Sequence, residues 1–92
     1  MIMEIFYTKH TDEKLKTEKF VPELKINKLV IKRAIQNSQL KVSEGMKIKA
    51  VQEIDKTHSL VVIYRQVEKG VRVITFFPAK KGRYEDEILS RR

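Results

Sequence analysis

The longest apolar runs of the chain lie in its last third. Two runs rich in β-branched residues, 58–65 and 71–78, stand on either side of a turn that ends at Gly70. Such runs joined by a glycine-containing turn are typical of a β-hairpin. Both runs are apolar at neighbouring as well as alternate positions, so we expect these two strands to lie in the middle of a sheet.

Two further strands follow from the same patterning. Residues 46–54 alternate between apolar and charged side chains, which predicts a half-exposed strand whose lysines protect an edge of the sheet. Residues 55–59 then form a hairpin turn, and residues 2–7 form a short first strand rich in aromatic and β-branched side chains. The stretch 37–45 carries Asn, Ser and Gly and predicts a loop.

Helical signals fill the region between the first strand and that loop. Thr8 is a good N-cap for a helix over residues 9–19, and Asp12 in its first turn favours the helix dipole. Pro22 disfavours helix at the residue before it, so residues 20–25 read as a connector.

A second helix is predicted over residues 28–37, with Asn27 as its N-cap. Its apolar positions recur at helical spacing: Val30, Ile31, Ala34 and Ile35. The order β-α-α-β-β-β predicts an α+β fold with two N-terminal helices packed on a small antiparallel sheet. We expect one domain over residues 1–92, in which 85–92 form either a short helix or a flexible tail.

The charge balance indicates what class of partner the protein binds. The chain has 20 Lys and Arg against 12 Asp and Glu, a formal charge of +8, and such an excess favours polyanions or an acidic protein. The densest cationic group is Lys80, Lys81 and Arg83, followed by Tyr84. Cations anchor phosphates and an aromatic ring stacks on a base, although the same residues also suit a solvated loop whose Tyr84 packs back on the sheet.

Two arginines on neighbouring strands are the second candidate group. Arg65 and Arg72 flank the predicted hairpin turn, where both can reach one side of the sheet. Arginine binds phosphate in a bidentate manner and stabilises charge in a phosphoryl transition state. In the alternative reading, both are solvated strand-end residues that pair with Glu53 or Glu68.

Few residues offer other chemistry. His10 suits a general acid or base or a capping residue, and His58 reads as an exposed turn residue. The sequence has no cysteine, no clustered metal ligands, no glycine-rich phosphate loop and no nucleophile turn, so we expect no metal and no cofactor. It also lacks a signal-peptide pattern and any apolar run of about 18–20 residues, so we expect a cytoplasmic protein without a membrane role.

Several short strings resemble a known group of proteins. They are Tyr7-Thr-Lys-His10, Ile26-Asn27, Leu60-Val-Val-Ile-Tyr-Arg65, Val73-Ile-Thr-Phe-Phe-Pro78 and Arg83-Tyr84. Together they resemble a widespread family of small bacterial and archaeal proteins that is similar to the BrnT-type and RelE/ParE-like toxins of toxin–antitoxin pairs. The resemblance covers nearly the whole chain. It implies a RelE-like fold, endoribonuclease or translation-inhibiting activity, and an acidic antitoxin as partner.

The resemblance also implies site residues. The family's helix-one histidine corresponds to His10, its strand arginine to Arg65, and its terminal Arg-Tyr pair to Arg83 and Tyr84. In metal-free RNA cleavage, Arg65 and Arg83 would hold the scissile phosphate while His10 or Tyr84 moves protons. The arginine that often closes helix one in this family is missing, since residues 16–19 contain none.

The hypothesis that follows is a toxin-type member of a toxin–antitoxin module that cleaves RNA without a metal. Four further cations would hold the RNA: Lys49, Arg72, Lys80 and Lys81. The first alternative is a non-catalytic basic module that binds RNA or an acidic protein. A second alternative is a structural partner that docks another chain on its apolar sheet.

Overall fold

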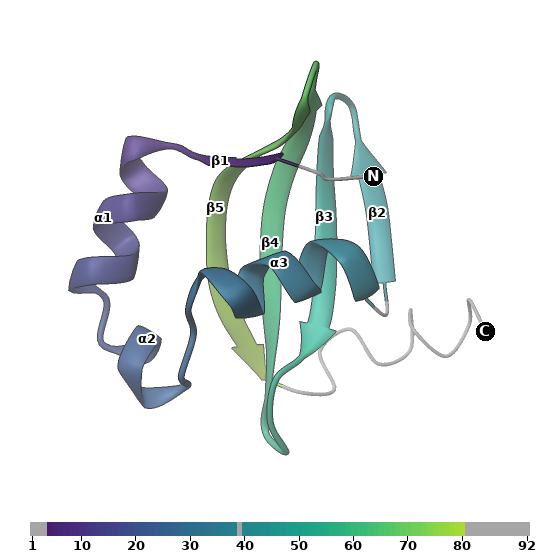
Figure 1. Cartoon of the computed structure of the whole chain (residues 1–92). Helices are drawn as coiled ribbons and strands as arrows, with labels where there is room; N and C mark the ends of the chain where they lie inside the picture. The colour runs from purple at the N-terminus through teal and green to yellow at the C-terminus, as the bar shows by residue number, and fades with distance from the viewer. Residues whose placement is uncertain (1–3, 39, 81–92) are drawn as a thin grey trace.

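The computed structural model describes residues 4–38 and 40–80. The elements in these residues are β1 (Glu4–Tyr7), α1 (Lys9–Thr17), α2 (Phe20–Glu23), α3 (Lys28–Asn37), β2 (Leu40–Glu44), β3 (Lys47–Glu53), β4 (His58–Val67) and β5 (Gly70–Lys80). They form an α+β fold with one five-stranded mixed sheet of order β1-β5-β4-β3-β2 (Figure 1). The fold class is therefore as predicted, whereas the element order and the purely antiparallel sheet are not.

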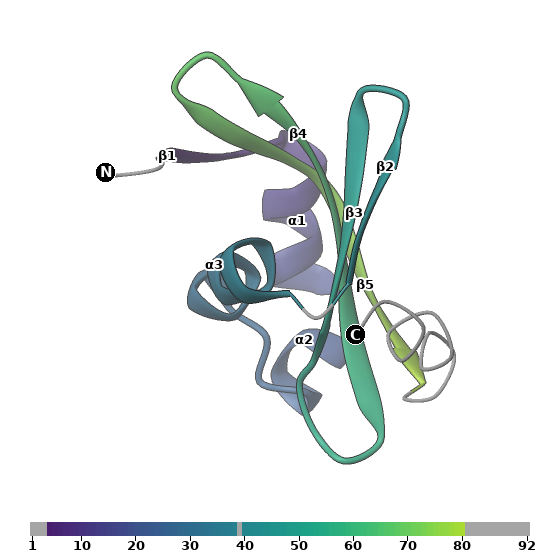
Figure 2. The same ribbon diagram turned by 90° about the vertical axis from the view of Figure 1, so that its right-hand side faces the viewer.

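The three helices lie on one face of the sheet, and no described element covers the other face (Figure 2). The main core lies under the helices. Helix α3 contributes Ile31, Ala34 and Ile35, three of the four positions that its spacing predicted, whereas the fourth, Val30, is only partly buried. Its partner side chains on the sheet include Leu60, Val62, Val73 and Phe76.

The predicted loop over residues 37–45 is wrong, because Leu40–Glu44 forms strand β2. β2 pairs with β3 through the two-residue turn Gly45-Met46, in which Gly45 has a φ of 64°. A glycine with positive φ at the first central position is the pattern of a type II′ hairpin turn. The same pairing places β3 between β2 and β4, so β3 does not form the edge that its lysines suggested.

The first strand pairs in a way that the sequence did not predict. β1 runs parallel to β5, with Glu4 opposite Gly70 and Tyr7 opposite Val73. Parallel strands cannot be joined by a hairpin, so this contact depends on long-range packing. Gly70 permits the close approach, because a Cβ atom at this position would overlap the carbonyl of Glu4.

The predicted helix starts are confirmed, and their ends differ by a few residues. Thr8 Oγ1 accepts a hydrogen bond from the Thr11 amide at 3.2 Å, and Asn27 caps α3 in the same way. Helix α1 ends at Thr17, two residues before the predicted Lys19. The predicted connector contains the short helix α2, because Pro22 lies in a first turn where its missing N–H has no helical partner to lose.

Helix α2 ends in a Schellman-type motif without a glycine. The amide of Ile26 donates to the Val21 carbonyl at 2.8 Å, and the amide of Lys25 donates to the Pro22 carbonyl at 3.3 Å. Lys25 adopts a φ of 56°, the left-handed conformation that normally favours glycine. This turn directs the chain from α2 into α3.

Helix α1 closes the edge of β5 beyond the end of β1. Thr11 is fully buried, and its hydroxyl lies 3.2 Å from the Val73 carbonyl and 3.1 Å from the Ile74 carbonyl. Lys14 Nζ donates to the Phe76 carbonyl at 2.6 Å. These side chains satisfy backbone acceptors that an open strand edge would leave to water.

Candidate nucleic-acid interface

The face of the sheet without helices carries its own apolar cluster. On β4 the side chains of Leu60, Val62 and Tyr64 pack under the helices, so the odd-numbered residues between them point to the other face. There they join a cluster that we call the apolar patch. Its members are Leu40, Val42, Val51, Val61, Ile63, Phe77 and Ala79.

A bulge in β5 keeps arginine and patch residues on this same face. Ile63 pairs with Thr75 and Tyr64 pairs with Val73, so Ile74 is an extra residue in β5. The bulge changes the parity of the strand. Arg72 before the bulge and Phe77 after it therefore both point away from the helices.

Charged residues gather on this face beside the apolar patch. Arg65 and Arg72 stand directly opposite each other on β4 and β5, so their side chains share one face. Phe6 of β1 pairs with Arg72 from the other side. Lys47 and Lys49 occupy the positions of β3 that alternate with Ile48, which packs against the helix-side core. We call this group the basic end: Phe6, Lys47, Lys49, Arg65 and Arg72.

The two arginines lack an acidic partner among residues 4–38 and 40–80. Lys49 forms an ion pair with Glu44 at 3.4 Å, but neither Arg65 nor Arg72 forms an ion pair or a hydrogen bond with a described residue. The alternative in which they pair with Glu53 or Glu68 is therefore not what the structure shows. The Nε atom of Arg65 is buried without a hydrogen-bond partner. Like charges directly opposite in a sheet are destabilising, so an anion bound between the two arginines would relieve their repulsion.

The other predicted site residues fall elsewhere or outside the described ranges. His10 is exposed in the first turn of α1, and its side chain forms no hydrogen bond or ion pair with the described residues. Lys80 ends β5 opposite His58, about 25 Å along the strand from Arg72 at the usual rise per residue. Lys81, Arg83 and Tyr84 lie outside the described residues, as does the predicted tail 85–92.

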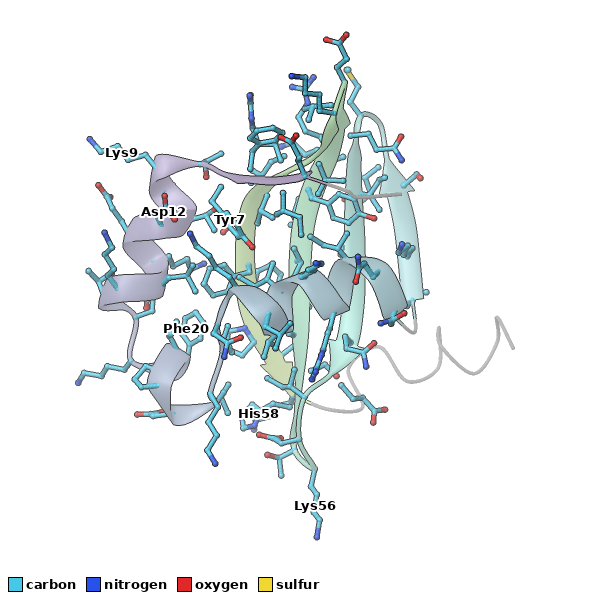
Figure 3. All side chains as sticks on the ribbon, viewed as in Figure 1. Tyr7, Lys9, Asp12, Phe20, Lys56 and His58 are labelled. Atoms are coloured by element: carbon cyan, nitrogen blue, oxygen red, sulfur yellow. The ribbon has the colours of Figure 1, made fainter. Side chains whose placement is uncertain are left out.

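The structure thus brings together Arg65, Arg72 and Lys49 of the predicted set, but not Lys80 or His10. Figure 3 shows His58 and Lys56 at one end of the sheet and Tyr7, which follows Phe6 in β1, towards the other. Sequence reasoning missed Phe6, whose side chain is 39% exposed, and Lys47. Alternation along Glu4–Tyr7 could have indicated that Phe6 points away from the core. That Phe6 lies beside Arg72 follows only from the parallel pairing of β1 with β5.

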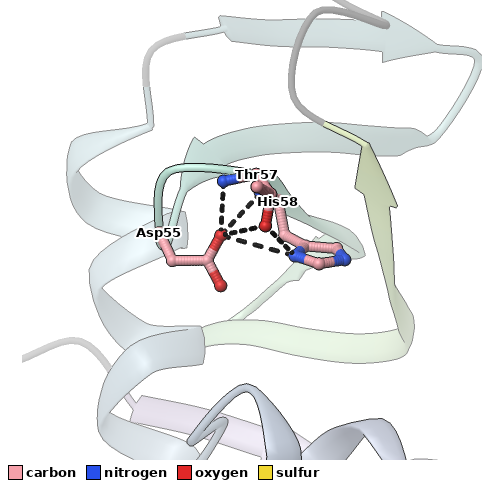
Figure 4. Close-up of polar contacts among 3 residues, drawn as sticks. All are labelled: Asp55, Thr57 and His58. Atoms are coloured by element: carbon pink, nitrogen blue, oxygen red, sulfur yellow. Dashed lines mark hydrogen bonds and ion pairs between the residues drawn. The ribbon is translucent and has the colours of Figure 1, made fainter.

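Polar contacts within the turn between β3 and β4 hold the backbone and side chain of His58 in place. Asp55 Oδ1 accepts hydrogen bonds from the amides of Thr57 and His58, each at 2.7 Å, and from the Thr57 hydroxyl (Figure 4). The imidazole Nδ1 of His58 lies 2.8 Å from that hydroxyl and 3.4 Å from the carboxylate. Hydrogen bonds, first of all from the Thr57 amide, lower the pKa of Asp55 below its ordinary value. His58 is half-buried as the first residue of β4, more enclosed than the predicted exposed turn residue.

A hollow between α2, α3 and the end of β3 has a different character. It has a volume of about 630 Å³, and its charged lining mixes Lys25 and Arg33 with three acidic residues. Such a lining does not favour a polyanion over any other solute. Within residues 4–38 and 40–80, no group of three or more His, Asp or Glu side chains could hold a metal ion.

No protein-family model, curated protein or solved structure matches the chain. The resemblance to RelE- and BrnT-type toxins therefore stays a prediction that rests on short strings of sequence. None of the helices in the described part of the chain has the length and apolar character needed to span a membrane.

Proposed function

We propose that this protein binds single-stranded RNA through the basic end of its helix-free face. The observation that supports this most directly is the cross-strand pair of Arg65 and Arg72, which has no anionic partner among the described residues. A phosphate between two guanidinium groups would relieve their repulsion and receive charge-assisted hydrogen bonds.

The neighbours of this pair extend the same surface. Lys47 and Lys49 extend the positive charge onto β3. On β1, the half-exposed ring of Phe6 offers a surface on which a base can stack. From β1 to β3 the strip crosses three strand spacings, about 14 Å in all. Phosphate contacts with stacked bases beside them are the usual basis of sequence-tolerant binding to single strands.

The catalytic form of the proposal is a RelE-like toxin that acts as a metal-free endoribonuclease in a toxin–antitoxin module. It is supported by the excess of basic residues, by the α+β fold class and by the sequence resemblance. Arg65 would hold the scissile phosphate with Arg83, and His10 or Tyr84 would move protons. In the described residues His10 and Arg65 lie on different elements without contact, so binding has the stronger structural support.

Binding is tested by fluorescence anisotropy of a labelled single-stranded RNA in EDTA, over a salt series. The variant carries Arg65→Gln and Arg72→Gln, and its control carries Lys32→Gln and Arg33→Gln. The control removes the same charge from exposed positions on α3, on the opposite face. If each arginine contacts one phosphate, the log–log salt slope falls by about 1.4 in the first variant only. Equal weakening in both variants would contradict the assignment of the site.

Cleavage is read on a gel from the same reactions. Discrete fragments that vanish with Arg65→Gln, His10→Ala or Arg83→Ala would support the endoribonuclease. Intact RNA with a salt-sensitive shift would leave the non-catalytic binding module. If RNA neither binds nor breaks, the same cations belong to an interface with an acidic protein, and the proposal is wrong.

A further inference from the structure

Strand β1 forms one edge of the sheet, and its outward backbone groups have no partner in the described part of the chain. The amide of Thr8, which follows β1, donates to the Val73 carbonyl at 3.4 Å. Backbone groups point to alternate sides along a strand, so the amides and carbonyls of Ile5 and Tyr7 face away from β5. No hydrogen bond joins these four groups to a described residue. Such a row of unpaired donors and acceptors can pair with an added strand.

The fold closes the neighbouring part of the same sheet edge but not β1 itself. Beyond the end of β1, the side chains of Thr11 and Lys14 bond to outward carbonyls of β5. Native proteins usually protect an open edge with a bulge, a proline or charged side chains. β1 contains neither bulge nor proline, and its only charged residue, Glu4, stands at its first position. Within the described residues this edge is therefore open to another chain.

A hollow beside this edge offers both apolar and cationic contacts. It lies between β1 and α3, has a volume of about 370 Å³, and is lined by Ile5, Tyr7, Lys28, Leu29 and Lys32. The side chain of Leu29 is 55% exposed, so a residue that covers it removes apolar surface from water. The hollow therefore suits an apolar side chain of a strand that pairs with β1.

Two lysines of α3 give the hollow its charge. Lys28 forms an ion pair with Asp12 at 3.7 Å, and its Nζ lies 4.6 Å from the centre of the Tyr7 ring. Lys32 is exposed and forms no ion pair with a described residue. A second copy of this chain would bring its own lysines and its formal charge of +8 to the same edge. Charge complementarity thus favours an acidic chain over self-association.

We propose that β1 accepts an extended, acidic segment of a partner protein as a sixth strand of the sheet. The segment would pair with the outward groups of Ile5 and Tyr7, place an apolar side chain in the hollow, and set carboxylates beside the two lysines. RNA offers phosphates but no backbone ladder that matches a strand edge. The added strand would lie two strand spacings, about 10 Å, from β5. The pair of Arg65 and Arg72 therefore stays open, and this docking does not rest on the proposed RNA binding.

Docking is tested by an NMR titration of the ¹⁵N-labelled full chain with a synthetic peptide. The probe is a capped heptapeptide in which threonines alternate with glutamate, isoleucine and glutamate, so that the acidic and apolar side chains share one face. We expect the amide signals of Ile5 and Tyr7 to shift downfield until saturation, and their hydrogen exchange to slow about tenfold as they gain acceptors. No change at both amides up to millimolar probe would overturn the proposal, as would changes concentrated on Lys47, Arg65 and Arg72.

Matched variants separate this site from general attraction between charges. Lys28→Gln combined with Lys32→Gln should raise the Kd of the probe about fivefold, since each exposed ion pair contributes modestly. The control carries Lys16→Gln and Lys19→Gln at exposed positions near the end of α1 and should leave the Kd unchanged. Equal weakening in both variants would overturn the assignment of the hollow. Leu29→Ser should weaken the probe as well, and circular dichroism confirms that each variant is folded.

N-methylation of the probe tests whether it binds as a strand. Methyl groups on the amides that face β1 would block the ladder, whereas methyl groups on the amides between them would leave it intact. Of two probes methylated on these alternate sets, one should lose binding and the other should keep it. Equal binding of the two probes would overturn strand pairing.

The same NMR signals distinguish the other possible occupants of this edge. Shifts of the Ile5 and Tyr7 amides when the concentration of the protein alone is raised would assign the edge to a second copy. The same shifts on addition of RNA would assign it to RNA, and either result would overturn the proposal of an acidic chain. Because the peptide titration uses no RNA, a failure of the proposed RNA binding leaves its outcome unchanged.

Discussion

Replacement of Arg72 by glutamine should stabilise the protein while it weakens RNA binding. Arg72 is exposed and stands opposite Arg65 in the ladder, and neither has an acidic partner in the described chain. Two like charges about 6 Å apart repel by about 0.7 kcal/mol in water. Cross-strand pairs contribute about 0.2–1 kcal/mol, so we expect Arg72→Gln to raise the free energy of unfolding by about 0.5 kcal/mol.

A double-mutant cycle isolates this repulsion from other effects of the substitutions. Urea unfolding of the wild type, Arg65→Gln, Arg72→Gln and the double variant gives the coupling energy. The double variant should gain less stability than the sum of the single variants. In a chain of this size the gain from Arg72→Gln corresponds to a rise in Tm of about 2–4 °C, and 1 M salt should reduce the coupling by screening.

A zero or attractive coupling would refute the reasoning. It would mean that an acidic group already neutralises the two arginines, or that their side chains diverge from the shared face. A loss of stability in Arg72→Gln together with unchanged RNA affinity would also contradict the view that this pair is kept for binding. Lys32→Gln serves as the control, because it removes one charge from an exposed helix position.

Three further predictions concern the stability of the fold. Thr11→Val should lower the free energy of unfolding by about 1–3 kcal/mol, because the carbonyls of Val73 and Ile74 lose the hydroxyl proton that they share. Thr17→Val in the same helix, where the hydrogen bond is exposed, should cost clearly less in urea unfolding. Lys25→Gly should raise the free energy of unfolding by about 0.5 kcal/mol by removing left-handed strain, and a loss would contradict the assigned turn. Asp55→Ala should destabilise the protein at pH 7, and the loss should shrink as the pH falls below about 4. The pKa of Asp55 is lowered in the fold because its ionised carboxylate accepts the hydrogen bonds of the turn, so protonation removes this contribution to stability. A difference in the free energy of unfolding that is independent of pH would contradict this role.

The sequence predicted the elements whose signals are local. The β4–β5 hairpin follows from two long apolar runs around a short turn, and α3 follows from its cap at Asn27 and its apolar spacing. β2 was missed because Leu40 and Val42 are its only apolar residues, so its stability comes mainly from pairing with β3 and from the apolar patch. The parallel β1–β5 contact was missed because it joins the start of the chain to residue 70 and beyond.

The same distinction holds for the candidate site. Arg65 and Arg72 lie close to one turn, so their shared face could be predicted from the hairpin register. Phe6 joins them only through a long-range pairing, which no local pattern reveals. Lys80 looked like part of one patch because it is close in sequence to other cations, yet β5 extends to Lys80 and places it at the far end of the sheet from Arg72.

The most direct test of the central claim is an NMR titration of the ¹⁵N-labelled protein with a short single-stranded RNA in EDTA. The account predicts that chemical shift changes concentrate on the basic end and on adjacent residues of β1, β3, β4 and β5. They should weaken as salt increases, and signals of Lys56 and Lys80 should move little. Changes concentrated at Lys56, Lys80 and His58, or on the exposed side of α3, would contradict the account.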